Sequence, residues 1–333
     1  MTATPGNGSY SGSSMPDSIA AAVEYITEKM DEIIAIEAKT NGMQADPSLI
    51  RATGIAGTVQ LATLETTGLG DYSVQNGFPQ GAATLSWQSY TLNNDRGIRL
   101  VLDRKETMQS GGLASAANAA AELMRSQVIP EIDATRMAKL YSSVNTYASS
   151  TNIDTGAKPT KANVIGSIIE ACDVVSDATG IDEGLTIYVN GGLRSAVDTS
   201  TEVTKVQQVL DPATGLNTVA RSINGNKIVY VPAARMHTTV TLNDGFTNAY
   251  SDTTTTPPTV DYTKYGFTGG GNDIWFAVTA PGVAQGVTAI NTLGIIPAEQ
   301  SEQFDGDILK YRVYHDLIVP KNKAKGAFVF KSS

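Results

Sequence analysis

Histidine and cysteine are scarce in this chain, which limits the chemistry that it can perform. Among its 333 residues there are two histidines, His237 and His315, and one cysteine, Cys172. A single cysteine cannot form an intrachain disulfide, so we expect a reducing folding compartment. A catalytic triad would need one of the histidines, but His315 and its neighbour Asp316 lie in a predicted strand and would point to opposite faces. We therefore predict a structural role for His315.

Motifs for metal ions and cofactors are also missing. One cysteine and two distant histidines do not make a zinc site, and neither HExxH nor GxxxxGK[ST] occurs. Glu131 and Asp133 could form a carboxylate pair, but they follow Pro130 at a predicted helix start, where acidic side chains favour the positive end of the helix dipole. We predict that these two carboxylates cap the helix, and that the protein has no metal, no cofactor and no enzymatic activity.

Charge is sparse, and basic charge is sparser. Charged residues make up 17% of the chain, and the formal net charge is −9. Proteins that bind nucleic acid cluster lysine and arginine against phosphates, whereas only Lys321, Lys323 and Lys325 form a short basic run here. No apolar stretch approaches transmembrane length, and residues 1–14 lack the blocks of a signal peptide. We expect no sequence-specific DNA binding and no membrane partner, and sparse charge is typical of a chain that buries surface in an assembly.

The first part of the sequence predicts an arm followed by an amphipathic helix. Residues 1–14 are rich in Gly, Ser and Thr, and Ser14 and Pro16 suit a helix start. The apolar residues of this helix alternate spacings of four and three, as in a coiled-coil seam: Ile19, Val23, Ile26, Met30 and Ile33. The pattern leaves open whether the seam is one face of an ordinary surface helix or docks on a partner.

Glycine-punctuated β-type runs occupy residues 48–102 and predict a long β-hairpin. We expect residues 98–103 to be its return arm, with one buried face. An alanine-rich helix follows over about residues 113–128 and should lie on a sheet, and Pro130 should kink or restart it. Asp95, Arg96 and Asp103 are predicted to be salt-bridge anchors that join the hairpin to this helix.

The remaining sequence mixes helices and strands, which predicts an α+β fold. A helix over residues 160–178 places Cys172 on its apolar face, and residues 223–232 predict a hairpin with an Asn-Gly turn. Residues 248–273 are poor in core residues and predict a long exposed loop. Residues 308–330 predict two antiparallel strands around a Lys/Asn turn.

Three stretches of the sequence, residues 70–109, 128–133 and 311–329, resemble one protein family, the major capsid proteins of tailed bacteriophages. Residues 128–133 (VIPEID), which include Pro130, Glu131 and Asp133, are similar to the spine helix of that family. Residues 311–329 match the way in which these proteins end, through Arg312, His315 and Asp316. Residues 70–109 resemble the extended loop and its return strand, through Asp71-Tyr72, Gly77-Phe78, Trp87, Tyr90, Asp95-Arg96-Gly97 and Asp103.

The resemblance implies the Hong Kong 97-type capsid fold. Residues 1–50 would be the N-terminal arm and 51–100 the extended β-hairpin loop. Residues 101–159 with 300–333 would form the peripheral domain with its long spine helix, and residues 160–299 the axial domain with a mixed sheet and helices.

The resemblance also implies a function and partners. The chain would be a structural head protein that assembles through pentamers and hexamers into an icosahedral shell around phage double-stranded DNA. Assembly would take place in the cytoplasm of the bacterial host, and the product would be the virion. The implied partners are many copies of the chain itself, a portal and a decoration protein. Either a separate scaffolding protein assists assembly, or the helix over residues 16–38 is the remnant of a scaffolding domain.

Two other interpretations stay open. The same fold could build an encapsulin-like cellular compartment around a cargo enzyme. The Thr/Tyr-rich stretch 247–265 suggests instead a β-rich adhesin or receptor-binding module, which would bind its ligand as a monomer.

Overall fold

The computed structural model describes most of the chain from residue 37 onward. The predicted apolar seam of Ile19, Val23, Ile26, Met30 and Ile33 lies outside the described residues. The described ranges are 37–45, 50–52, 57–75, 77–109, 116–148, 150–200, 206–210, 217–246, 250–252, 259–298 and 305–333.

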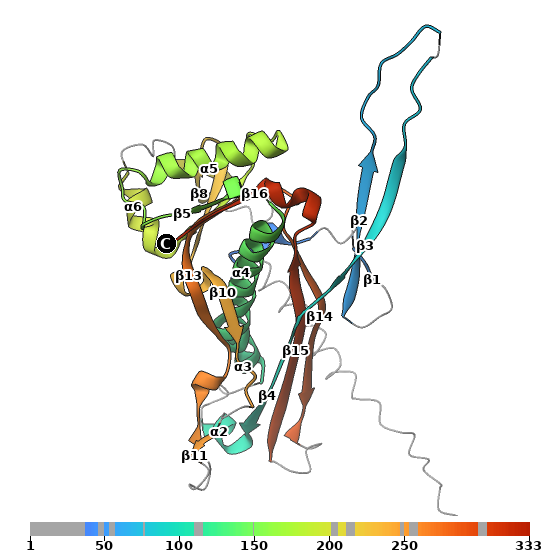
Figure 1. The fold of residues 1–333 in the computed structure, drawn as a ribbon. Helices are drawn as coiled ribbons and strands as arrows, with labels where there is room; N and C mark the ends of the chain where they lie inside the picture. The colour runs from blue at the N-terminus through green and yellow to red at the C-terminus, as the bar shows by residue number, and fades with distance from the viewer. Residues whose placement is uncertain are drawn as a thin grey trace, which may run out of the picture.

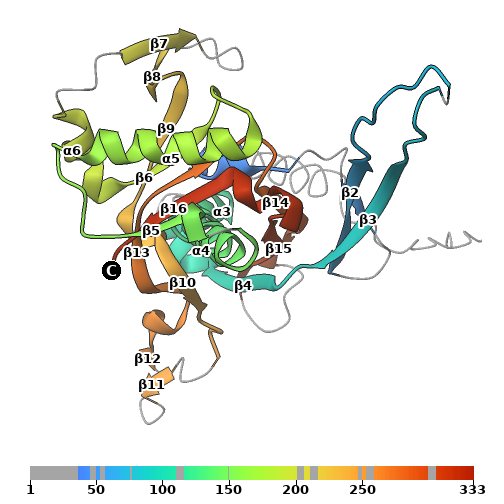
Figure 2. The same cartoon turned by 45° about the horizontal axis from the view of Figure 1, so that its top comes forward.

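Two sheets with a long helix between them form the body, and a hairpin projects from it (Figure 1). The long helix is α4 (Ile129–Tyr147), which Figure 2 shows nearly end-on between the two sheets. Runs of strands that pair mostly antiparallel are combined with a few helices, so the predicted α+β class is confirmed.

The hairpin consists of β2 (Thr58–Thr66) and β3 (Ala83–Thr91), with the short β1 (Ile50–Ala52) beside the base of β2. The antiparallel pairing runs from Thr58 opposite Thr91 to Thr66 opposite Ala83. The return arm is therefore β3, and the prediction that residues 98–103 form this arm is wrong. Those residues lie in β4 (Asn94–Asp103), a strand of the body whose side chains alternate between half-buried and exposed, because only one of its faces is covered.

The first body sheet has the order β14–β15–β4 and is antiparallel throughout. Strands β14 (Gln285–Ile296) and β15 (Gly306–Ile318) are long, and β15 lies in the middle. Helix α3 (Ala116–Leu123) packs on this sheet through Ala120, which is buried with Leu309 and Val313. The small side chain of Ala120 fits the prediction that the alanine-rich helix lies flat on a sheet. The short helix α2 (Arg104–Gln109) follows β4.

One helical path runs from α3 to the end of α4 without a break. The residues Met124–Val128 form a π-helical turn between them, and the backbone on both sides of this turn stays helical. Pro130 lies in the first turn of α4. If the preceding turn were a regular α-helical turn, the proline ring would clash with the backbone carbonyl four residues earlier. A π turn widens the helix at this point, so the disturbance predicted at Pro130 takes the form of a bulge and the helix does not restart.

The second sheet has the order β5–β16–β13–β6–β9–β8–β7, and β10 also pairs with β13. It is mixed, because β6 pairs in parallel with β9 and β16 in parallel with β5. Helix α5 (Val164–Thr179) covers it, and the predicted Asn224-Gly225 turn joins β8 to β9 with φ angles of 49° and 82°. The remaining elements are β5 (Ile153–Thr155), β6 (Thr186–Asn190), α6 (Arg194–Asp198), β7 (Val206–Leu210), β8 (Asn217–Ile223), β9 (Asn226–Val231), β10 (His237–Leu242), β13 (Phe267–Thr279), β16 (Ala327–Lys331) and the small pair β11 (Tyr250–Asp252) and β12 (Thr259–Val260).

Two predictions about strand pairing are wrong. Residues 267–273, including the glycine triplet, begin strand β13 and do not belong to a loop, because β10 pairs with them. Strands β15 and β16 do not form a hairpin but lie in different sheets. The intervening turn Lys321–Gly326 is a 3-10 helix whose Ala324 and Gly326 are buried, and this packing carries the chain from one sheet to the other.

Candidate functional site

Three charged side chains lie buried in the first two turns of α4. Glu131 is 8% exposed, Asp133 is not exposed and Arg136 is 1% exposed. A buried charge is tolerated only when it is paired and hydrogen-bonded, so each of these side chains must have partners in other elements. We call Glu131, Asp133 and Arg136, together with those partners, the charged junction.

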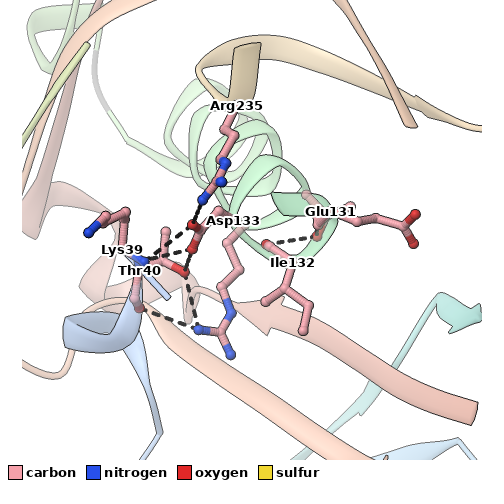
Figure 3. Close-up of polar contacts among 8 residues, drawn as sticks. Lys39, Thr40, Glu131, Ile132, Asp133 and Arg235 are labelled. Atoms are coloured by element: carbon pink, nitrogen blue, oxygen red, sulfur yellow. Dashed lines mark hydrogen bonds and ion pairs between the residues drawn. The ribbon is translucent and has the colours of Figure 1, made fainter. Parts of the chain in front are cut away.

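Asp133 binds the chain just before the hairpin and a turn of the second sheet (Figure 3). Its Oδ1 accepts hydrogen bonds from the Thr40 backbone N–H at 3.0 Å and from the Thr40 hydroxyl at 2.7 Å. Its Oδ2 accepts from the Lys39 backbone N–H at 3.2 Å and pairs with Arg235 at 2.9 Å. Four donors around one carboxylate compensate for its burial.

Arg136 points to the same segment from the next turn of the helix. Its Nη1 donates to the Thr40 carbonyl and to the Thr40 hydroxyl, both at 3.3 Å, and its Nη2 donates to Gln44 Oε1 at 2.9 Å. Burial lowers the pKa of the Arg136 guanidinium from its ordinary value, while the Asp133 carboxylate acts in the opposite direction. The Thr40 hydroxyl therefore donates to one buried charge and accepts from the other.

Glu131 joins the first sheet to the helix. Both of its oxygens accept from the fork of Arg96, with Nε to Oε1 at 2.6 Å and Nη2 to Oε2 at 3.2 Å. Arg96 lies on β4 and also donates to the backbone carbonyls of Asn243 and Gly266, which flank the turn region between β10 and β13. One guanidinium thus connects β4, α4 and the chain between β10 and β13. Its two contacts with Glu131 have the bidentate geometry that arginine favours.

The predicted helix-capping role of Glu131 and Asp133 is wrong. Because the helical path continues back through the π turn, the start of α4 has no free helix end. The two carboxylates take their hydrogen bonds from partners distant in sequence.

The other predicted anchors have different positions. Asp95 forms a bidentate pair with Arg312 across β4 and β15, with oxygen–nitrogen distances of 2.9 and 2.6 Å, and the pair is exposed. Arg312 lowers the pKa of the Asp95 carboxyl below its ordinary value. Asp103 lies at the far end of β4, where its carboxylate accepts from the Lys105 N–H in the turn that begins α2. A ten-residue strand spans about 30 Å, so the predicted role of Asp103 at the hairpin is wrong.

The base of the hairpin is held by residues near the end of β15. Asp316 accepts from the backbone and side chain of Asn93, at 3.1 and 3.3 Å, and the Tyr314 hydroxyl donates to the Leu92 carbonyl at 2.9 Å. His315, between them, is 1% exposed. Tyr90 packs against a small apolar cluster at this base, formed by Ala45, Val59, Leu61, Leu92, Val287 and Ile318. The hairpin thus leaves the body from a packed base.

The rest of the hairpin exposes an unusual amount of apolar surface. Phe78 is 86% exposed, and its ring lies 5.0 Å from that of Tyr72 near the tip. Trp87, half exposed on β3, stacks under Arg51 at 5.9 Å. Of the eleven exposed large hydrophobic side chains in the described part of the protein, six belong to this hairpin: Leu69, Tyr72, Val74, Phe78, Leu85 and Trp87. Exposed apolar patches of this kind mark surfaces that become covered.

Sequence reasoning missed Thr40, Arg136 and Arg235. The spacing of three residues between Asp133 and Arg136 could have indicated a buried pair of charges on one helix face. No local signal marks Thr40 or Arg235, because they lie 93 and 102 residues from Asp133 along the chain.

The described residues show no arrangement typical of a metal centre or a membrane span. Within the described ranges, no three His, Cys, Asp or Glu side chains gather as metal ligands would. No helix in the same ranges is both long and apolar enough to cross a membrane. Burial raises the pKa of the Cys172 thiol to about 11, as expected of a core cysteine on α5.

Several solved structures are similar to this chain in fold. No protein-family model and no curated protein matches the sequence. A solved chain of Gordonia phage Cozz is 13% identical, with 89% of this chain and 86% of that chain covered, at a TM-score of 0.50. A chain of the bacteriophage PhiM1 mature capsid is 14% identical, covers 84% and 82%, and has a TM-score of 0.48. A virus-like particle from Pyrococcus furiosus is 10% identical, covers 92% and 100%, and has a TM-score of 0.42.

The likeness to the Gordonia phage Cozz chain is one of fold. The chain has the α+β fold of the Hong Kong 97 type that its sequence predicted.

Proposed function

We propose that this chain is the shell subunit of a tailed-phage head, which assembles through pentamers and hexamers into an icosahedral container for double-stranded DNA. The observation that supports this proposal most strongly is the projecting hairpin, which has exposed apolar side chains and a base that is packed against the body. A lone subunit gains nothing from exposing Leu69, Val74 and Phe78 on a long arm. A second copy that covers them gains hydrophobic stabilisation of about 25 cal/mol per Å² buried.

The fold supports the same proposal. The hairpin would be the extended loop that reaches a neighbouring copy, and residues 1–50 the N-terminal arm. The loop would end at residue 93 and not at the expected residue 100, because β4 pairs with β15 in the body. Residues 94–159 with 300–333 would form the peripheral domain around α4, and residues 160–299 the axial domain, with two exchanges: β14 pairs with β15 of the peripheral domain, and β16 pairs with β13 of the axial domain. The net charge of −9 is compatible with a shell wall that does not bind the enclosed DNA tightly. A scaffolding protein, a portal and a decoration protein would be the partners, in the host cytoplasm and in the virion.

Electron microscopy of the purified full chain tests the proposal. The structure indicates a clean variant, because the Thr67 N–H donates to the Ala82 carbonyl at 3.0 Å where the two arms of the hairpin separate. Replacing residues 68–81 with Asn-Gly should close the hairpin with a two-residue turn and leave the body folded. We expect closed shells from the parent chain and only unassembled subunits from the variant. Normal shells from the variant would contradict the role of the hairpin.

A matched pair of point variants narrows the test to the apolar tip. Phe78 and Phe246 are almost equally exposed, at 86% and 88%, but only Phe78 lies on the hairpin. Phe78→Ser should reduce the yield of shells more than Phe246→Ser does. A chain that remains monomeric under all conditions would contradict the proposal. Particles that enclose a cargo enzyme and no DNA would show that the shell belongs to a cellular compartment and not to a phage.

A further inference from the structure

Residues 38–45, which we call the latch segment, are inserted between α4 and both sheets. Thr40 is not exposed, Met43 is 1% exposed and Ala45 is 6% exposed. Met43 belongs to the main core with residues of α4 and the second sheet. The Ala45 N–H donates to the Gly286 carbonyl of β14 at 3.0 Å. The latch segment therefore contacts β14 in the first sheet as well as the second sheet and the helix.

Two glycines leave the space that the latch segment and its partner need. A Cβ on Gly42 would lie 2.9 Å from the Tyr188 hydroxyl of β6, and a Cβ on Gly286 would lie 2.6 Å from Arg136 Cζ. Both distances are below ordinary van der Waals contact. The fit of the segment thus depends on the absence of side chains at these positions.

The buried charges beneath the latch segment have an alternative pairing. In this structure the Asp133 carboxylate accepts hydrogen bonds from Lys39 and Thr40. The Arg136 guanidinium donates to Thr40 and Gln44. If the segment leaves, Asp133 keeps Arg235, but Arg136 loses these acceptors. Residues three apart on a helix share a face, and the Asp133 carboxylate already acts to raise the pKa of the Arg136 guanidinium, so the two side chains can pair once the segment leaves. This second pairing limits the cost of leaving a charge buried and unpaired.

We propose that residues 38–45 are a releasable latch on α4. In the closed state shown here, Arg136 and Asp133 hold the segment, and the segment ties the helix to β14. In the open state Arg136 pairs with Asp133, and β14 loses the hydrogen bond that the Ala45 N–H donates to the Gly286 carbonyl. A partner or a force that acts on the latch segment reaches α4 through these contacts. The latch is a property of one subunit and does not depend on the shell.

Hydrogen exchange of the full, unassembled chain tests the latch. Gly42→Ala places a methyl group against the Tyr188 hydroxyl and should open the latch. We expect exchange to quicken together in residues 38–45, in α4 and in β14, by about tenfold for each 1.4 kcal/mol of closed-state stability lost. The hairpin arms β2 and β3 should not change beyond their base.

Two further variants control the experiment. Gly294→Ala lies on the same strand as Gly286, but its Cβ would meet no atom closer than 3.9 Å, so it should leave exchange unchanged. Adding Tyr188→Phe to Gly42→Ala removes the clashing oxygen and should restore protection toward that of Tyr188→Phe alone.

The outcomes separate the latch from a local defect. Faster exchange confined to residues 38–45, with α4 and β14 unchanged, would overturn the proposal, and so would unchanged exchange in all three. If Gly42→Ala does not fold, Thr40→Val is the milder test, because it removes the hydroxyl between Asp133 and Arg136 and keeps the volume. It should produce the same joint loss of protection, and a loss restricted to the segment would again refute the latch.

Discussion

The burial of His315 makes the stability of the protein depend on pH in a way that can be measured. His315 lies on β15 opposite Thr288 and is 1% exposed. Within the described part of the chain, neither ring nitrogen has a hydrogen-bond partner. Burial, aided by the nearby charges of Arg136 and Arg96, lowers the pKa of His315 from 6.5 to about 3.

The sign and size of the effect follow from this pKa. An unfolded histidine titrates near pH 6.5, so below that pH the unfolded chain binds a proton that the folded chain does not. Stability is therefore intact above about pH 6.5 and falls as the pH drops toward 3. At pH 5 the unfolded group is about 1.5 units below its pKa, and since one unit corresponds to about 1.4 kcal/mol, the folded state loses about 2 kcal/mol from His315.

Urea unfolding of the unassembled subunit at pH 7.5 and pH 5 provides the assay. His315→Gln cannot titrate, so its loss of stability between the two pH values should be smaller than that of the parent chain by about 2 kcal/mol. His237→Gln, which replaces the partly exposed histidine 3.2 Å from Asp273, is the matched control and should keep the loss that comes from His315. Equal pH dependence in the parent chain and His315→Gln would refute the reasoning.

The two ion pairs of β4 should contribute very differently to stability. Glu131→Gln removes the carboxylate from Arg96, whose side chain is 22% exposed, and should lower the free energy of unfolding by about 2 kcal/mol, read from the urea midpoint. Asp95→Asn breaks a pair whose side chains are 44% and 56% exposed, so its loss should not exceed about 1 kcal/mol. Equal losses from the two variants would show that burial does not decide the strength of these pairs.

The hairpin and the latch segment meet at one apolar cluster. Ala45, at the end of the latch segment, packs with Val59 and Leu92 of the hairpin base and with Val287 of β14. In the closed state this contact holds the base of the hairpin on the body, whereas the exposed apolar side chains of the hairpin lie farther out along its arms.

Much of the local structure could be predicted from short-range patterns. The helix over residues 160–178, the Asn224-Gly225 turn and the strands at 58–61 and 84–87 follow from periodicity and turn chemistry, which act between residues close in sequence. The fold class and the family resemblance rest on the order of these elements. The strand pairings could not be predicted in the same way, because nothing local distinguishes a hairpin partner of β15 from β4, more than two hundred residues away.

From the sequence alone, this protein was expected to have few groups for catalysis, a glycine-rich hairpin and a helix with Glu131 and Asp133 close behind Pro130. The roles of these charges depend on the tertiary fold. Local rules assigned the two acids to a helix end, but the π turn removes that end and burial forces each charge to find a partner. The partners Arg96, Thr40 and Arg235 come from three distant parts of the chain, since a buried charge is satisfied by whatever the fold brings to it.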